Sequence, residues 1–174
     1  ALYRNLGDGT FSEEAAIAGV NDVDGRGNGG CSSDFDNDGD QDLYLTNYGQ
    51  SRLFLNDGDS TFTDATIIAG LKDSNPFFRS TGCAWGDYDQ DGYLDLIVVR
   101  HLHEWDKNIF HTKDYFSAVG GLALYRNNAD GTFTNLTSLL KDPTHEVVVP
   151  LRGEGQVMGN IWGAGYQPGW LDFD

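Results

Sequence analysis

One short pattern of apolar and polar residues occurs three times in the chain. Each copy is an apolar run, a turn rich in Gly, Asp and Asn, and a return that begins with Thr-Phe. Apolar runs on both sides of such a turn are the short-range signal of a β-hairpin. The sequence therefore predicts hairpins over residues 2–11, 53–62 and 124–133.

A second pattern, of strand, acidic loop and strand, lies between the hairpins. Residues 31–45 match residues 83–97, and in both copies an apolar strand follows the loop. The two patterns together give four antiparallel strands in roughly 50 residues, which is typical of one blade of a β-propeller. Blades that stack radially bury both faces of each sheet. The sequence thus predicts an all-β fold, a segment of a propeller with four-stranded blades.

The register of the repeat divides the chain into four parts. The chain opens at the third strand of one blade and stops within a third acidic loop. Since complete rings have about four to eight blades, we expect about two and a half to three blades of a larger propeller. The expected parts are the second half of a blade with a linker at 1–27, a blade at 28–78, a blade at 79–161 with insertions at 100–121 and 141–161, and the start of a further blade at 162–174.

The acidic loops, 34–42 and 87–95, share the pattern D-x-D-x-D-G-x-x-D. Ca²⁺ takes about six to eight oxygen ligands in a flexible shell. Carboxylates at loop positions 1, 3, 5 and 9 and a backbone carbonyl at position 7 can supply them, while Gly at position 6 permits the sharp turn. The incomplete third loop begins in the same way. The expected Ca²⁺ ligands are Asp34, Asp36, Asp38, Asp40, Asp42, Asp87, Asp89, Asp91, Tyr93, Asp95, Asp172 and Asp174, with Asp40 and Tyr93 acting through their carbonyls.

Two other readings of the loops are less suitable. An EF-hand needs Glu at position 12 and flanking helices, whereas Leu45 and Val98 stand there and the flanks are β-patterned. Mg²⁺ is less suitable than Ca²⁺ because it prefers a rigid octahedral site and keeps several of its waters. A solvated acidic turn without a metal is the remaining alternative. It is disfavoured because four or five carboxylates within nine residues repel one another strongly unless a cation lies among them.

The loops and hairpins resemble FG-GAP/VCBS repeats, the calcium-loop propeller repeats of integrin α-subunit heads. The resemblance rests on both loops, on the N-x-x-D-G-T-F hairpin at 127–133 and on the W-G-D-Y-D segment at 85–89. The chain is most similar to the bacterial and cartilage-acidic-protein branch, whose members often add an ASPIC/UnbV module that is not visible in these residues. The resemblance implies a seven-bladed propeller in which the loop aspartates bind Ca²⁺.

The charge balance narrows the possible partners. The chain has 27 acidic and 11 basic residues and a formal net charge of −16, which disfavours nucleic acid and anionic membrane surfaces. No apolar run approaches the roughly 20 residues of a membrane span, and the first residues lack a signal-peptide pattern. Glycine accounts for 23 of 174 residues and aromatic residues for 13%, which indicates a turn-rich folded chain rather than a disordered acidic tail.

The sequence predicts a calcium-stabilised propeller that is extracellular, on the cell surface or periplasmic. We expect a non-enzymatic scaffold, adhesion or protein-interaction module, or an accessory subunit of a larger assembly. Its expected partners are other protein subunits, matrix or glycans, and the rest of the propeller from the same parent chain.

The alternative is an enzyme that acts on polysaccharides, or a carbohydrate-binding propeller, with its site on the insertion at 100–121. Imidazoles there could bind a transition metal, and aromatic rings could stack on sugars. The candidate residues are His101, His103, His111, Trp105, Tyr115 and Trp162.

Two smaller features remain. Cys31 and Cys83 occupy equivalent positions of the repeat; one bridge between them is possible by number, but we expect two small buried residues. Asn135-Leu136-Thr137 is a glycosylation sequon, which has a meaning only in a eukaryotic secreted protein.

Overall fold

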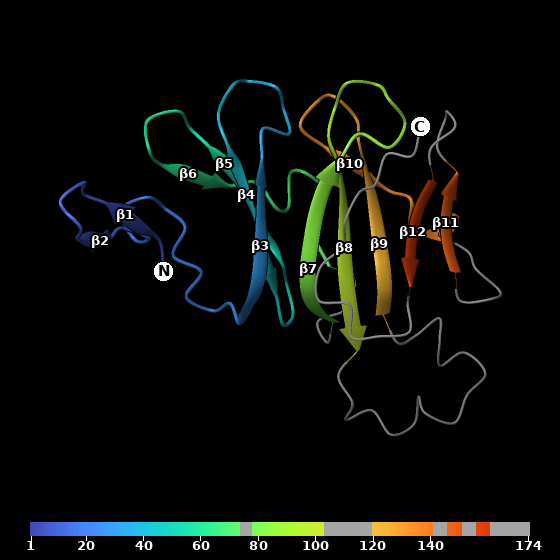
Figure 1. Ribbon diagram of the computed structural model, residues 1–174, viewed down its shortest axis with the longest axis horizontal. Helices are drawn as coiled ribbons and strands as arrows, with labels where there is room; N and C mark the ends of the chain where they lie inside the picture. The colour runs from blue at the N-terminus through green and yellow to red at the C-terminus, as the bar shows by residue number, and fades with distance from the viewer. Residues whose placement is uncertain (74–77, 103–119, 141–145, 151–155, 161–174) are drawn as a thin grey trace.

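The computed structural model describes residues 1–73, 78–102, 120–140, 146–150 and 156–160 (Figure 1). These residues form β-strands and turns, with one 3-10 turn, η1 (Thr137–Leu139), and no α-helix among them. The expected all-β class is confirmed. The described part of the chain has no helix that could cross a membrane.

Two four-stranded antiparallel sheets form the centre of the structure, each with its strands in chain order. The first contains β3 (Gly27–Ser33), β4 (Asp42–Asn47), β5 (Arg52–Asn56) and β6 (Phe62–Asp64). The second contains β7 (Phe78–Gly86), β8 (Asp95–Leu102), β9 (Gly120–Asn127) and β10 (Phe133–Asn135). These meanders are the predicted blades.

Two hairpins flank the sheets in sequence. The first pairs β1 (Tyr3–Asn5) with β2 (Phe11–Glu13). The second pairs β11 (Glu146–Pro150) with β12 (Gln156–Asn160) and lies within the 141–161 insertion, for which the repeat predicts no strand. The boundaries of the four parts and the number of blades in the complete ring remain predictions.

The two sheets share one apolar core. Phe35 stacks on Trp85 with ring centroids 5.8 Å apart, and Phe133 contacts both rings. Buried side chains of both sheets surround this group. Burial of a large apolar side chain stabilises a fold by about 1.5–3 kcal/mol, so the blades stabilise each other. The buried members of this core include Tyr44, Leu53, Leu96, Val98, Ala123 and Tyr125.

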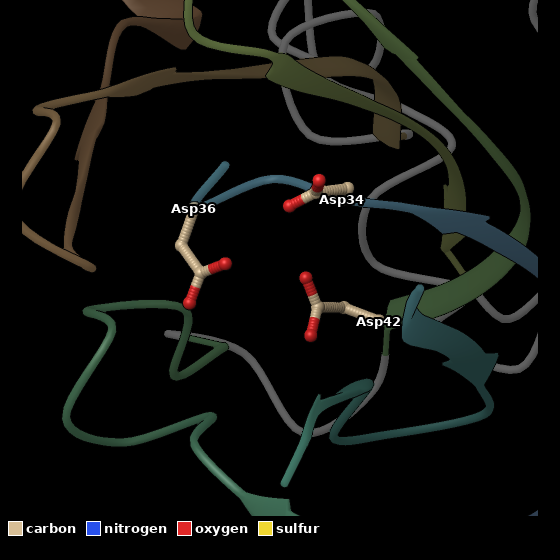
Figure 2. Close-up of side chains that lie close together, drawn as sticks. All are labelled: Asp34, Asp36 and Asp42. Atoms are coloured by element: carbon tan, nitrogen blue, oxygen red, sulfur yellow. The ribbon is translucent and has the colours of Figure 1, made fainter. Parts of the chain in front are cut away.

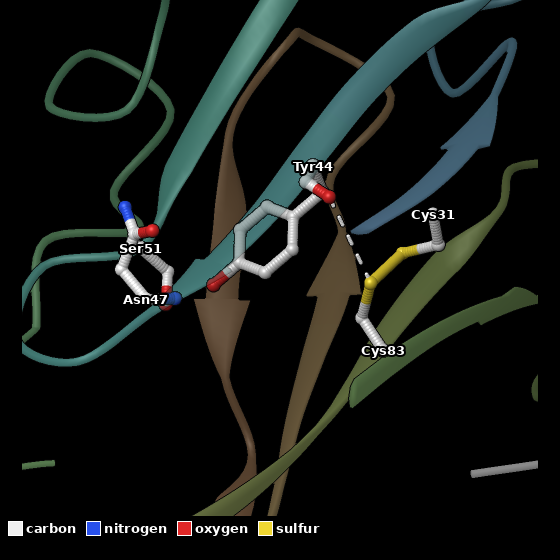
Figure 3. Close-up of a disulfide and its surroundings, with 5 residues drawn as sticks. All are labelled: Cys31, Tyr44, Asn47, Ser51 and Cys83. Carbon is white, nitrogen blue, oxygen red and sulfur yellow. Dashed lines mark hydrogen bonds between the residues drawn. A yellow bond between two sulfur atoms is a disulfide. The ribbon is translucent and has the colours of Figure 1, made fainter. Parts of the chain in front are cut away.

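A disulfide joins Cys31 of β3 to Cys83 of β7 across this interface (Figure 3). Their Cα atoms are 5.9 Å apart, and the Cys83 sulfur lies 3.8 Å from the carbonyl oxygen of Tyr44. The expectation of two unlinked buried residues is therefore wrong. The reason is radial packing, which places the first strands of successive blades side by side, so that equivalent repeat positions face each other.

The turn that follows the outer strand of each blade docks on the next blade. The N–H of Phe62 donates to the carbonyl of Ala18 at 2.8 Å, and the N–H of Phe133 donates to the carbonyl of Ala69 at 2.9 Å. These equivalent contacts explain why Ala18-Gly19-Val20 recurs as Ala69-Gly70-Leu71, an Ala-Gly-apolar motif whose role the sequence alone did not show.

The glycine of this motif meets two requirements at once. Gly19 and Gly70 have φ of +78° and +76°, which side chains with a Cβ rarely adopt. A Cβ at Gly19 would lie 2.5 Å from the Phe62 carbonyl oxygen, and one at Gly70 would lie 3.1 Å from that of Phe133. The turn therefore needs glycine both for its conformation and for the close approach of the next blade.

A linker aspartate in each repeat bonds to the end of the blade's second strand. Asn47 donates to Asp22 at 2.6 Å, and at the equivalent place Arg100 donates to Asp73 at 2.6 Å. The Arg100 and Asp73 side chains are only 8% and 1% exposed. A buried pair of this kind is costly to break, because the remaining charge would be unpaired. These contacts fix the linker against the sheet that follows it.

Reduction of the Cys31–Cys83 disulfide should lower the free energy of unfolding by up to about 4 kcal/mol, the loop-closure entropy for a separation of 52 residues. Thermal unfolding with and without reductant measures this, and the Cys31→Ala/Cys83→Ala double variant should not respond to reductant. A free thiol titrated in non-reduced, denatured protein would contradict the disulfide.

Alanine at the linker glycines Gly19 and Gly70 should destabilise the protein more than alanine at Gly131 of the β9–β10 turn, with the largest loss for Gly19→Ala. Gly131 is a matched control, because its φ is +80° and a Cβ there would meet nothing within 4 Å. Gly131→Ala should therefore cost only the backbone term, about 1–2 kcal/mol. Chemical denaturation of the three variants checks the order, and equal losses would show that the close approach to the next blade does not matter.

Candidate metal centre

Each acidic loop joins the first two strands of a sheet. Residues 34–41 connect β3 to β4, and residues 87–94 connect β7 to β8. These loops and the β5–β6 and β9–β10 turns lie at the same end of the two sheets, the upper end in Figure 1. Both acidic loops are thus at one end of the sheets.

The two loops have the same internal hydrogen bonds. The first carboxylate of each loop accepts two backbone N–H groups, from the fifth and sixth positions: Asp34 from Asp38 and Gly39, both at 3.0 Å. The Asp87 carboxylate accepts the equivalent pair at 3.0 and 2.9 Å. Gly39 has a φ of +100°, as the expected sharp turn requires, and the equivalent glycine of the second loop has a φ of +91°. The repeated sequence therefore builds the same loop twice.

Three carboxylates converge in each loop. Asp34, Asp36 and Asp42 each offer an oxygen within 4.8 Å of the others, and Figure 2 shows the three groups directed toward one space. The second loop brings together Asp87, Asp89 and Asp95 in the same way. We call these sets the first and second triads. In both, the ninth-position aspartate is fully buried and the other two are half-buried.

The geometry of each triad is compatible with one Ca²⁺ ion. Their donors are all carboxylate oxygens, the ligand type that hard cations prefer. Two ligands of one Ca²⁺ lie about 2.3–2.6 Å from it and hence at most roughly 5 Å from each other. The 4.8 Å limit on oxygen separations within each triad is compatible with that span.

The ninth-position aspartate also ties its loop to the neighbouring hairpin. Asp42 accepts the N–H of Phe35 at 3.2 Å and that of Asn56 at 2.9 Å. Asp95 accepts the equivalent groups of Tyr88 at 3.0 Å and Asn127 at 2.8 Å. This carboxylate therefore closes the loop and fixes the end of the third strand against it.

Burial shifts the pKa of three triad members upward. Desolvation raises the pKa of Asp42 to about 6 and that of Asp95 to about 7, from an ordinary 3.8. The pKa of Asp36 is raised by burial first and then by the charges of Asp38 and Asp34. Without a cation the folded protein thus holds these groups where their charged forms are unfavourable.

Other predicted ligands lie differently. Asp38 and Asp91 are not members of the triads; each caps its loop by accepting, at 2.9 Å, the N–H two residues ahead. The carboxylate of Asp40 points to the β5–β6 turn, near Gly58. The carbonyls of Asp40 and Tyr93 stay predicted ligands.

Several candidates lie outside the described residues. Among the predicted ligands these are Asp172 and Asp174. In the alternative site they are His103, Trp105, His111, Tyr115 and Trp162, while His101 is placed by its backbone in β8.

The hairpin asparagines hold the acidic loops, and one of them joins two loops, a role that sequence reasoning missed. Asn127 donates to the carbonyl of Leu94 in its own blade at 3.1 Å and to that of Phe35 in the first loop at 2.7 Å. At the equivalent place in the first blade, Asn56 donates to the carbonyl of Gln41 at 3.0 Å. The recurrence of Asn at one place in each hairpin was the available signal.

Comparison with known proteins identifies the repeat. Residues 34–98 match the model of the FG-GAP-like repeat. This segment is thus similar to the FG-GAP-like repeat. The matched residues run from the first aspartate of one loop to the strand after the other, so the FG-GAP-like match includes both triads and confirms the resemblance seen in the sequence.

The chain is also similar to cartilage acidic protein 1 of three vertebrates. It is 39% identical to the Xenopus tropicalis protein over 100 residues, and 38% identical to the Mus musculus and Homo sapiens proteins over the same length. The match covers 55% of this chain but only 14–15% of those proteins. The similarity therefore extends beyond the repeat match and concerns a small part of each relative.

If Ca²⁺ binds the triads, the stabilisation that it gives should shrink on acidification. A folded-state pKa of about 6 or 7 lies above the ordinary value of 3.8, so protonation of Asp42 and Asp95 favours the metal-free fold. The stability that this protonation adds to the metal-free fold is complete below about pH 4 and is lost as the pH rises through 6 to 7. Ca²⁺ competes with these protons. The melting temperature in excess Ca²⁺ minus that in chelator should be large at pH 7.5 and small at pH 5; a difference independent of pH would contradict this.

Proposed function

We propose that this chain is part of a calcium-loaded propeller that acts outside the cytosol as a scaffold or protein-interaction module. One observation carries the proposal: two triads of aspartates stand at the same place in two successive blades. A single acidic cluster is common on protein surfaces, whereas the same cluster built twice by the same loop, with the same hydrogen bonds, supports a shared ligand.

The proposed role of Ca²⁺ is to hold the loop face together. Asp34, Asp36 and Asp42, or their equivalents in the second loop, would supply the oxygens. At about 4 Å each pair of charges costs on the order of 1–4 kcal/mol, depending on the effective dielectric. A cation among them removes this repulsion and leaves the loop, the hairpin and the next blade in their observed contact.

A location outside the cytosol is supported by the disulfide and by the loops. Disulfides persist in oxidising compartments and are rare in the cytosol, and Cys31 and Cys83 form one here. Calcium modules with weak affinity suit the high extracellular Ca²⁺ concentration. The similarity to cartilage acidic protein 1 agrees with an extracellular setting.

The module would contact partners rather than transform a substrate. The triads are built from carboxylates that the loop and hairpin backbones already engage, which suits a structural ion. Other protein subunits or matrix components are the proposed partners, and the net charge of −16 favours basic surfaces on them.

Calorimetric Ca²⁺ titration of the protein with its native flanking sequences tests the proposal. Asp36→Asn and Asp89→Asn should each remove one bound ion, and the double variant should remove two. Asp40→Asn is the matched control, since it removes a loop carboxylate that lies outside the triad, and its ion count should equal that of the wild type. A hundredfold excess of Ca²⁺ over Kd should stabilise the wild type by about 2.7 kcal/mol per site.

The opposite results are equally clear. Equal ion counts for the wild type and both triad variants, or a melting curve that does not respond to chelator, would mean that the loops are acidic turns without a metal. Hydrolysis or binding of a polysaccharide by protein with intact triads would instead favour the alternative function.

A further inference from the structure

We propose that Asn135 is a site of N-linked glycosylation. Asn135-Leu136-Thr137 has the N-x-T form with a residue other than proline in the middle, and it is the only such sequence among the 174 residues. The proposal rests on an extracellular location in a eukaryotic organism and is independent of the calcium sites.

Asn135 is placed where a glycan can be accommodated. It is the last residue of β10, the outer strand of the second sheet, and its side chain is exposed, as is that of Thr134 beside it. A large hydrophilic group attached here would extend away from the sheet. It would displace nothing in the core, to which Phe133 of the same strand contributes but Asn135 does not.

The local turn presents the amide nitrogen that becomes modified. The Oδ1 atom of Asn135 accepts the N–H of Thr137 at 2.9 Å, which closes an Asx turn. Nδ2 makes no hydrogen bond to the described part of the chain, so it remains available. The hydroxyl of Thr137 accepts the N–H of Leu124 at 3.3 Å and so holds the sequon against β9.

The first sheet shows that the fold itself does not need asparagine here. Asp64 ends β6 as Asn135 ends β10, and its Oδ1 accepts the N–H of Thr66 at 3.0 Å in the same turn. Asp64 also pairs with Arg52 at 2.6 Å. An oxygen acceptor is all that the turn requires. Asparagine adds only the amide nitrogen, which is the group that glycosylation uses.

The chemistry is the transfer of an oligosaccharide from a lipid-linked diphosphate donor of the secretory pathway. A bond forms between the first sugar carbon and Nδ2 of Asn135. The bond from that carbon to the diphosphate oxygen breaks, the lipid diphosphate leaves, and Nδ2 loses one proton. The glycan would shield the open edge of β10 from pairing with other strands, a protection that exposed sheet edges need.

The test is expression of the protein, with its native flanking sequences, through the secretory pathway of a eukaryotic cell. Glycopeptide mapping of the wild type should find a glycan on Asn135, and a peptide N-glycosidase should remove it and leave aspartate at that position. An unmodified Asn135 peptide, or a glycan that resists this enzyme and maps elsewhere, would overturn the proposal.

Variants separate the sequon from the turn. Asn135→Asp keeps the acceptor oxygen that closes the turn, so it should lose the glycan and keep the melting temperature of unglycosylated wild-type protein made in a bacterial periplasm. Thr137→Ser should retain the glycan, and Thr137→Ala should lose it. If a variant fails to fold, the wild-type map still decides. Ca²⁺ binding by deglycosylated protein should be unchanged, so failure here and failure of the calcium proposal are distinguishable.

Discussion

The crowding of carboxylates at one end of each blade is the constraint on which the rest of the structure depends. Asp42 and Asp95 cannot move away from their neighbours without loss of their bonds to the loop and the hairpin. Burial disfavours their charges, and the adjacent aspartates disfavour them further. Protons or a cation that compensate the charge would therefore stabilise the folded loop. Ca²⁺ can do so at neutral pH, which is the role we propose for it.

The effect of an ion would extend beyond its own loop. Asn127 joins the second hairpin to the carbonyl of Phe35 in the first loop, and the Phe35 ring stacks on Trp85 in the core between the blades. The disulfide joins the same two sheets through their first strands. One continuous set of contacts thus runs from the first triad to the second blade. A metal ion that orders the first loop would therefore also stabilise the position of the next blade in the propeller.

The hairpins and the acidic loops could be predicted because their signals are local. Turn residues at fixed offsets specify the β5–β6 and β9–β10 turns, and Gly39 marks the sharp bend of its loop. The disulfide, the Asp73–Arg100 pair and the close approach at Gly19 could not be predicted so directly. Each depends on how one blade packs against the next or on where a linker runs, and no pattern within a single blade contains that information. Repeat-equivalent positions would have been the signal, since Cys31 and Cys83 match in the alignment of the two blades.

The number of acidic residues in a loop does not tell how many of them converge. Asp38 caps its loop and Asp40 points to the neighbouring turn, so three of the five aspartates in the first loop converge.

The most direct measurement is an anomalous-difference map from crystals grown in Ca²⁺. The account predicts one peak within each triad, with the same three aspartates bound in both loops. Strong diffraction data with no peak at either triad would contradict it.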